Sequence, residues 1–136
     1  MTTLPKEDLD LTLIYEERTG DFLFLLGTIL AFISNFKAEQ SLLTEKLLTV
    51  KPEEEKSTMS IALASWLFLL ASILFTHVAI IRFIELKSQQ SPTKSKNFPI
   101  LIKGSKLLII GDITKTAGFG IAAIAYLLKL IYYKGY

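Results

Sequence analysis

The chain has 136 residues, of which 51% are hydrophobic, and its formal net charge is +2. This hydrophobic content is high for a soluble domain of this length, and so small a charge gives no electrostatic basis for nucleic-acid binding. With no cysteine and one histidine, the composition excludes a disulfide framework, a thiolate metal site and a multi-histidine site within one chain. We therefore expect no cofactor and no nucleic-acid partner.

Residues 1–19 are rich in acidic side chains and precede the first apolar block. The acids lie where a helix dipole favours them, and Leu9, Leu13 and Ile14 could share one helical face. This pattern predicts a short N-terminal helix at the membrane surface or against the bundle. The stretch lacks the basic leader, apolar core and cleavage site of a removable signal peptide, so we expect the first span to remain in the protein.

A membrane span needs about 20 mostly apolar helical residues to cross about 30 Å of hydrocarbon. The first apolar block, residues 22–36, has only fifteen and must borrow from its flanks, so we place the first span at about residues 20–37. No helix breaker occurs between this block and Pro52, which predicts a helical extension beyond the span. This extension either meets a partner or a sister chain, or it is a solvated loop helix.

The second apolar block, residues 59–86, is long enough to span a membrane with tilt. Near its C-terminal end, Arg82 and Glu85 are three residues apart and could pair on one helical face. His77 has two interpretations. It is either a proton-responsive group, because histidine is the side chain that titrates nearest physiological pH, or a structural residue hydrogen-bonded to a neighbour.

A polar linker, residues 87–99, precedes the third block and is predicted to be an exposed loop. Residues 99–111 fit a helix or an interfacial segment, or a hairpin of two strands that turns at Gly104 and Ser105, and we favour the helix or interfacial segment. We place the third span at about residues 107–133, where tyrosines beside a lysine mark a membrane boundary.

Asp112 and Lys115 lie three residues apart near the start of this block. If the span begins at Leu107, they form a buried pair inside it, where each charge costs about 2.5–3.5 kcal/mol. If it begins at Ile113, Asp112 is its N-cap and Lys115 reaches back to the headgroups. We favour the second alternative, because residues 113–133 still number twenty-one. The candidate intramembrane polar site comprises His77, Arg82, Glu85, Asp112 and Lys115.

Small residues mark where membrane helices approach closely, because such helices associate by close packing and hydrogen bonding. Ser65 and Ser72 lie seven residues apart in the second block, with Thr76 nearby, and glycines and alanines crowd the third block. The candidate helix-packing or pore face comprises Ser65, Ser72, Thr76, Gly118 and Gly120.

These observations predict an all-α integral membrane protein with one domain, residues 1–136, that has three transmembrane helices, a helical extension after the first span and a short N-terminal surface helix. The function that we favour is non-enzymatic and works through homo-oligomerisation, or as a subunit of a larger membrane complex. Its partners are then the lipid bilayer and other membrane-protein chains. The alternative is a homo-oligomeric ion channel or pore lined by small and hydroxyl residues. A membrane enzyme comes third, because no nucleophile–base pair, phosphate-binding glycine loop or metal-ligand set occurs.

Orientation and location follow from the basic residues and the composition. Eight basic residues lie on the side of the N-terminus and six on the opposite side of the three predicted spans. The positive-inside rule then places the N-terminus in the cytoplasm. The abundance of lysine and isoleucine suits an AT-rich bacterium, so we expect a multi-pass protein of a bacterial plasma membrane.

Overall fold

The computed structural model describes the backbone of residues 6–48, 54–88 and 97–134. These residues form three long α-helices, namely α1 (Lys6–Leu48), α2 (Glu54–Ser88) and α3 (Phe98–Lys134). Each contains a stretch long and apolar enough to cross a membrane. The prediction of an all-helical protein with three such helices is therefore confirmed, and the helices indicate a multi-pass membrane protein.

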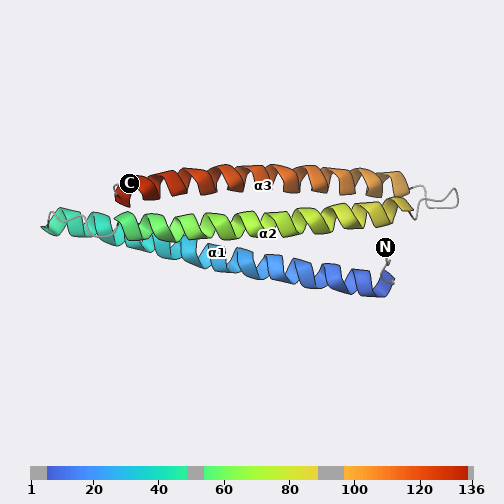
Figure 1. The fold of residues 1–136 in the computed structure, drawn as a ribbon, viewed down its shortest axis with the longest axis horizontal. Helices are drawn as coiled ribbons and strands as arrows, with labels where there is room; N and C mark the ends of the chain where they lie inside the picture. Colours follow the sequence, from blue (N-terminus) through green and yellow to red (C-terminus); the bar gives the residue numbers. More distant parts are fainter. Residues whose placement is uncertain (1–5, 49–53, 89–96, 135–136) are drawn as a thin grey trace.

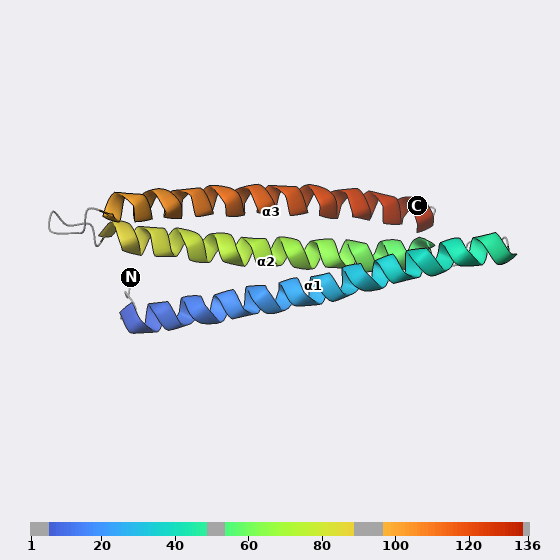
Figure 2. The ribbon, with the colours of Figure 1, turned by 180° about the vertical axis from the view of Figure 1, so that it is seen from behind.

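The helices form an elongated bundle with α2 in the middle. Both α1 and α3 pack along α2, whereas the backbones of α1 and α3 do not pack directly against each other. Figure 1 shows α2 between its two neighbours, and Figure 2 shows the same order from behind. Because α1 and α3 both run antiparallel to α2, they are parallel to each other.

The first helix is one continuous element. The predicted extension beyond the first span is helical as far as Leu48. The prediction of a separate short N-terminal helix is wrong, because α1 runs without interruption from Lys6 through the acidic segment into the apolar block. No proline lies within α1, and a glycine in a helix costs only about 1 kcal/mol, so nothing in this sequence ends the helix early.

Two glycines of α1 allow phenylalanine rings of α2 to pack directly on its backbone. A Cβ atom built on Gly20 would lie 2.7 Å from Phe75 Cε1, and one built on Gly27 would lie 2.7 Å from Phe68 Cε1. Real Cβ atoms do not approach so closely. The two glycines are seven residues apart, as are the two rings, so two successive contacts of the same kind fix the register of α1 on α2.

An aromatic cluster at this level connects all three helices. The Phe24 ring centroid lies 4.7 Å from that of Phe68 on α2 and 5.8 Å from that of Phe119 on α3. The Phe68 and Phe119 centroids are 5.3 Å apart. These separations are typical of favourable aromatic pairs, which add about 0.5–1.5 kcal/mol each to the burial of the rings. Side chains thus join α1 to α3 although their backbones do not pack.

The third helix begins earlier than its most apolar part. The amides of Ile100 and Leu101 donate to the Asn97 carbonyl at 3.1 and 3.2 Å, and Pro99 lies in the first turn, where a missing amide hydrogen costs nothing. The alternative of a hairpin at Gly104 and Ser105 is therefore wrong, and the preferred helical interpretation holds. Most of the predicted polar loop falls at residues 89–96, outside the described residues.

Candidate functional site

Two side-chain contacts join the N-terminal half of α1 to the C-terminal half of α2. His77 Nδ1 lies 2.7 Å from Glu16 Oε1, and Arg82 Nη1 donates to Glu17 Oε1 at 2.5 Å. The ribbons of α1 and α2 diverge in this region (Figure 2), so long side chains bridge a widening space. Arg82 thus pairs with a residue of another helix rather than with Glu85, the neighbour in its own helix that the spacing suggested.

Asp112 lies well inside α3, which begins at Phe98. The prediction that Asp112 caps a helix beginning at Ile113 is wrong, because the backbone is already helical there and leaves no free amides for a cap. The Asp112 side chain is 11% exposed and that of Lys115 is 66% exposed, with Lys115 Nζ 4.0 Å from Asp112 Oδ1. The two charges form an i, i+3 pair, as in the alternative in which the span begins at Leu107. Their depth in a membrane stays a prediction.

Two threonines join α2 to α3 beside these charges. Thr76 Oγ1 lies 3.2 Å from Thr116 Oγ1. Each hydroxyl also lies 2.8 Å from the carbonyl oxygen four residues earlier in its own helix, Ser72 O and Asp112 O respectively. Two hydroxyl protons serve three contacts, so the bond between the helices competes with the two local ones.

These contacts lie at one level of the bundle, because Thr76 and His77 are adjacent on α2 and reach α3 and α1 respectively. The level is on the N-terminal side of the aromatic cluster along α1. We call the charged side chains gathered there the charged belt. It comprises Glu16, Glu17, Asp21, His77, Arg82, Asp112 and Lys115.

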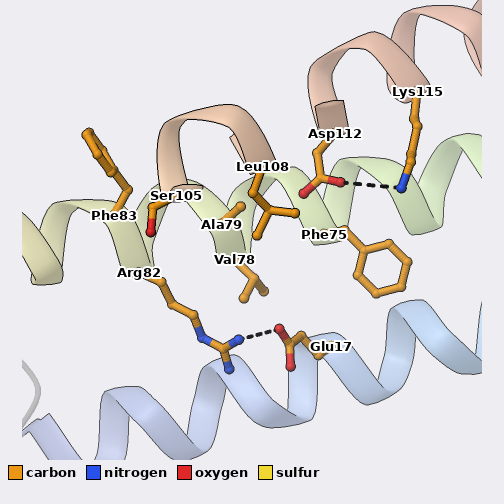
Figure 3. Close-up of a pocket in the computed structure, with 10 residues that line it drawn as sticks. All are labelled: Glu17, Phe75, Val78, Ala79, Arg82, Phe83, Ser105, Leu108, Asp112 and Lys115. Carbon is orange, nitrogen blue, oxygen red and sulfur yellow. Dashed lines mark hydrogen bonds and ion pairs between the residues drawn. The ribbon is translucent and has the colours of Figure 1, made fainter. Parts of the chain in front are cut away.

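A groove between α1 and α3, with α2 as its floor, contains most of the charged belt. One part has a volume of about 320 Å³ and is lined by apolar side chains and Ser105, together with the charged residues Glu17, Arg82, Asp112 and Lys115 (Figure 3). A second part of about 400 Å³ is lined mainly by Asp21, Phe24, Leu25, Thr28 and Ser72. Phe75 and Lys115 line both parts. The two parts therefore adjoin, and together we call them the inter-helix groove.

The residues of the predicted packing face do not all lie at helix–helix contacts. Some are buried between the helices and others are on the open surface. Ser65 and Ser72 are 4% and 2% exposed and lie between the helices, and among the described residues Ser72 Oγ has no hydrogen-bond partner. Gly120 makes an ordinary contact, with Leu69 Cδ1 3.7 Å from an added Cβ. A Cβ on Gly118 would meet no described atom within 4 Å, so none of the described helices packs on this glycine.

Sequence reasoning did not find the acids of α1 or the glycines that receive the rings. The acidic composition of residues 1–19 does not indicate that Glu16 and Glu17 supply the partners of His77 and Arg82. The glycine contacts did have a signal. The first predicted span contains two glycines seven residues apart, Gly20 and Gly27, and the second apolar block contains two phenylalanines seven residues apart, Phe68 and Phe75.

No known protein family, curated protein or solved structure matches this chain. The part of the chain that the structure describes contains no group of three histidine, cysteine, aspartate or glutamate side chains able to hold a metal ion. The length and apolar composition of the three helices indicate a multi-pass membrane protein with three candidate spans.

Proposed function

We propose that this chain is a non-enzymatic, three-span membrane protein that acts by assembling, either with copies of itself or as a small subunit of a larger membrane complex. The observation that carries the proposal is the exposure of apolar surface. Among the described residues only seven apolar side chains are buried, and five of them are alanines. The large apolar side chains of all three helices are mostly exposed, and such surface is stable against lipid or another apolar helix rather than water.

In this proposal the charged belt lies near one boundary of the membrane. Asp21 and Lys37 bracket fifteen residues of α1, which rise about 22 Å at 1.5 Å per residue. A hydrocarbon layer of about 30 Å exceeds this length, so either the bilayer thins or the edge of the belt enters the hydrocarbon. Lys115 and Arg82 have long side chains that can extend toward the headgroups from such a position.

The opposite boundary lies at the C-terminal end of α3. The Tyr132 and Tyr133 ring centroids are 5.3 Å apart, and Lys129 Nζ lies 5.5 Å from the centroid of the Tyr126 ring. Amphipathic aromatic rings beside a cation are typical of a membrane interface. The cytoplasmic N-terminus and the bacterial plasma membrane remain part of this proposal, resting on the distribution of basic residues and on composition.

The alternative function, a pore formed by several copies, receives less support. Ser65 and Ser72 are buried between helices of one chain, and Thr76 contacts Thr116. An assembly that keeps this packing would not line a water-filled path with these three side chains. A pore lined by α3 stays the alternative, since part of its polar and small-residue surface is exposed.

Purification in a mild detergent, followed by mass measurement of the protein–detergent complex, tests the proposal. A defined homo-oligomer, or co-purification of a different membrane protein in fixed ratio, is the expected result. A chain that remains monomeric and unaccompanied at all detergent concentrations would contradict it. Ion leakage from liposomes that contain the purified oligomer would favour the pore.

A further inference from the structure

Asp21 of α1 and Lys115 of α3 line the same part of the inter-helix groove, and both residues are exposed. Asp21 has no ion-pair partner among the described residues, and Lys115 reaches only Asp112, at 4.0 Å. Two opposite charges thus lie at one level on the two walls of a groove, and no ion pair joins them. A partner that brings the opposite charge to each of them would satisfy both.

The opposite charges extend along both helices on this side of the aromatic cluster. Residues 7–21 of α1 contain six acids and one base, whereas residues 98–115 of α3 contain three lysines and one aspartate. The two helices are parallel within one chain (Figure 1). Two copies inserted in the same orientation can therefore place α1 of one beside α3 of the other with acids and lysines at matching levels.

We propose that a second copy of this chain occupies the inter-helix groove, so that α1 of each copy packs against α3 of the other around a two-fold axis along the membrane normal. Asp21 of one copy then pairs with Lys115 of the other, and the axis makes this contact twice. The inference rests on the proposed assembly function and specifies its partner and its interface.

Charge selects this pairing among those that two parallel copies can make. Packing α3 against α3 would oppose Lys103, Lys106 and Lys115 with their own counterparts, and packing α1 against α1 would oppose the acids. Like charges at an interface weaken association and suppress the wrong pairing. On α3, a Cβ at Gly111 or Gly118 would meet nothing within 4 Å, so the backbone of an incoming helix can approach closely there.

Exchanging the two charges tests the interface. Asp21→Lys and Lys115→Asp, each purified alone in mild detergent, should dimerise at least about tenfold more weakly than the parent, because both copies of the contact become like-charged. An equimolar mixture of the two variants should regain the dimer, because both contacts in the mixed dimer are again complementary. Circular dichroism of each variant should show parent-like helicity, which separates lost assembly from lost folding.

Three further outcomes separate a failure of this interface from a failure of the proposed assembly function. A parent that dimerises while both variants also dimerise normally overturns this interface and leaves the proposed assembly function standing. A parent found only with a different protein overturns the second copy as occupant, and again leaves the assembly function. A parent that is monomeric and unaccompanied at every detergent concentration overturns both.

Cross-linking gives a second measurement of the same interface. It leaves Lys115 and its neighbour Asp112 unchanged. The chain has no native cysteine, so one tagged copy can carry Leu25→Cys and a differently tagged copy Gly118→Cys. Oxidation in membranes should join the two copies. Ile73→Cys replaces Leu25→Cys as a control, because Ile73 is 47% exposed but lines neither part of the groove. Equal cross-linking in both pairs, or none in either, would contradict the proposed interface.

Discussion

Replacing Gly20 or Gly27 with alanine should destabilise the packing of α1 on α2, although alanine is the better helix former. The added methyl group would lie 2.7 Å from a ring carbon of Phe75 or Phe68 respectively, whereas non-bonded carbons prefer about 3.5–4.0 Å. The ring or the helix would therefore have to move by about 1 Å. Phe68 has little freedom to move, since its centroid lies 4.7 Å from that of Phe24.

Two opposing effects set the change in the free energy of unfolding. Exchanging glycine for alanine in a helix interior stabilises by about 0.5–1 kcal/mol, and adding a methyl group to a filled contact costs about 1–3 kcal/mol. We expect a net loss of about 1 kcal/mol, up to 2, for each variant. Gly104→Ala is the matched control, because a Cβ there meets nothing within 4 Å. It should stabilise by about 0.5–1 kcal/mol.

The assay is reversible unfolding in mixed micelles with increasing sodium dodecyl sulfate, followed by far-ultraviolet circular dichroism. A double-mutant cycle adds a second criterion. Phe75→Leu should cost about 1 kcal/mol less in the Gly20→Ala background than in the parent, because the smaller side chain relieves the overlap. If Gly20→Ala and Gly27→Ala stabilise as Gly104→Ala does, the rings do not rest on the glycine backbone and the register of α1 on α2 is wrong.

Two further predictions use the same assay. Thr76→Val and Thr116→Val should each cost about 0.5–1 kcal/mol, because each removes the contact between the helices. The double variant should cost no more than either alone, because that contact is already lost in each single variant; additive losses would show that the hydroxyls do not contact each other. Asp112→Ala should cost no more than about 1 kcal/mol, because Lys115 is mostly exposed and loses only a weak pair, and a larger loss with reduced helicity would restore Asp112 as a helix cap.

The number and type of helices could be predicted because both follow from apolar length, which the sequence displays directly. The start of α1 could not be predicted, because an acidic amphipathic segment has the same sequence pattern whether it forms a separate surface helix or the first turns of a longer helix. The difference depends on whether any residue between them ends the helix. Gly20 is the only glycine near that junction, and it is compatible with a continuous helix when a ring packs on it.

The pairing of charges could be predicted only within one helix. The three-residue spacing of Asp112 and Lys115 allows the contact that the structure shows, because such neighbours share a face wherever the helix lies, although the alternative favoured from the sequence was a helix cap. The same spacing indicated Glu85 for Arg82, whereas Arg82 contacts Glu17, sixty-five residues earlier. Which acid of α1 comes level with Arg82 is set by the packing register of two helices, and local spacing contains no information on that register.

The glycines show the same limit and also how it can be reduced. Gly20 and Gly27 are seven residues apart, and so are Gly104, Gly111 and Gly118 in succession. Seven residues make about two helical turns, so the glycines of each set lie near one face of their helix. The spacing alone therefore predicts a packing surface equally well for both sets. What distinguishes them is a complementary pair of large side chains with the same period, which Phe68 and Phe75 supply for α1. For α3 the described helices of the same chain supply none at Gly104, Gly111 or Gly118, and in the proposed dimer α1 of the second copy packs beside that face.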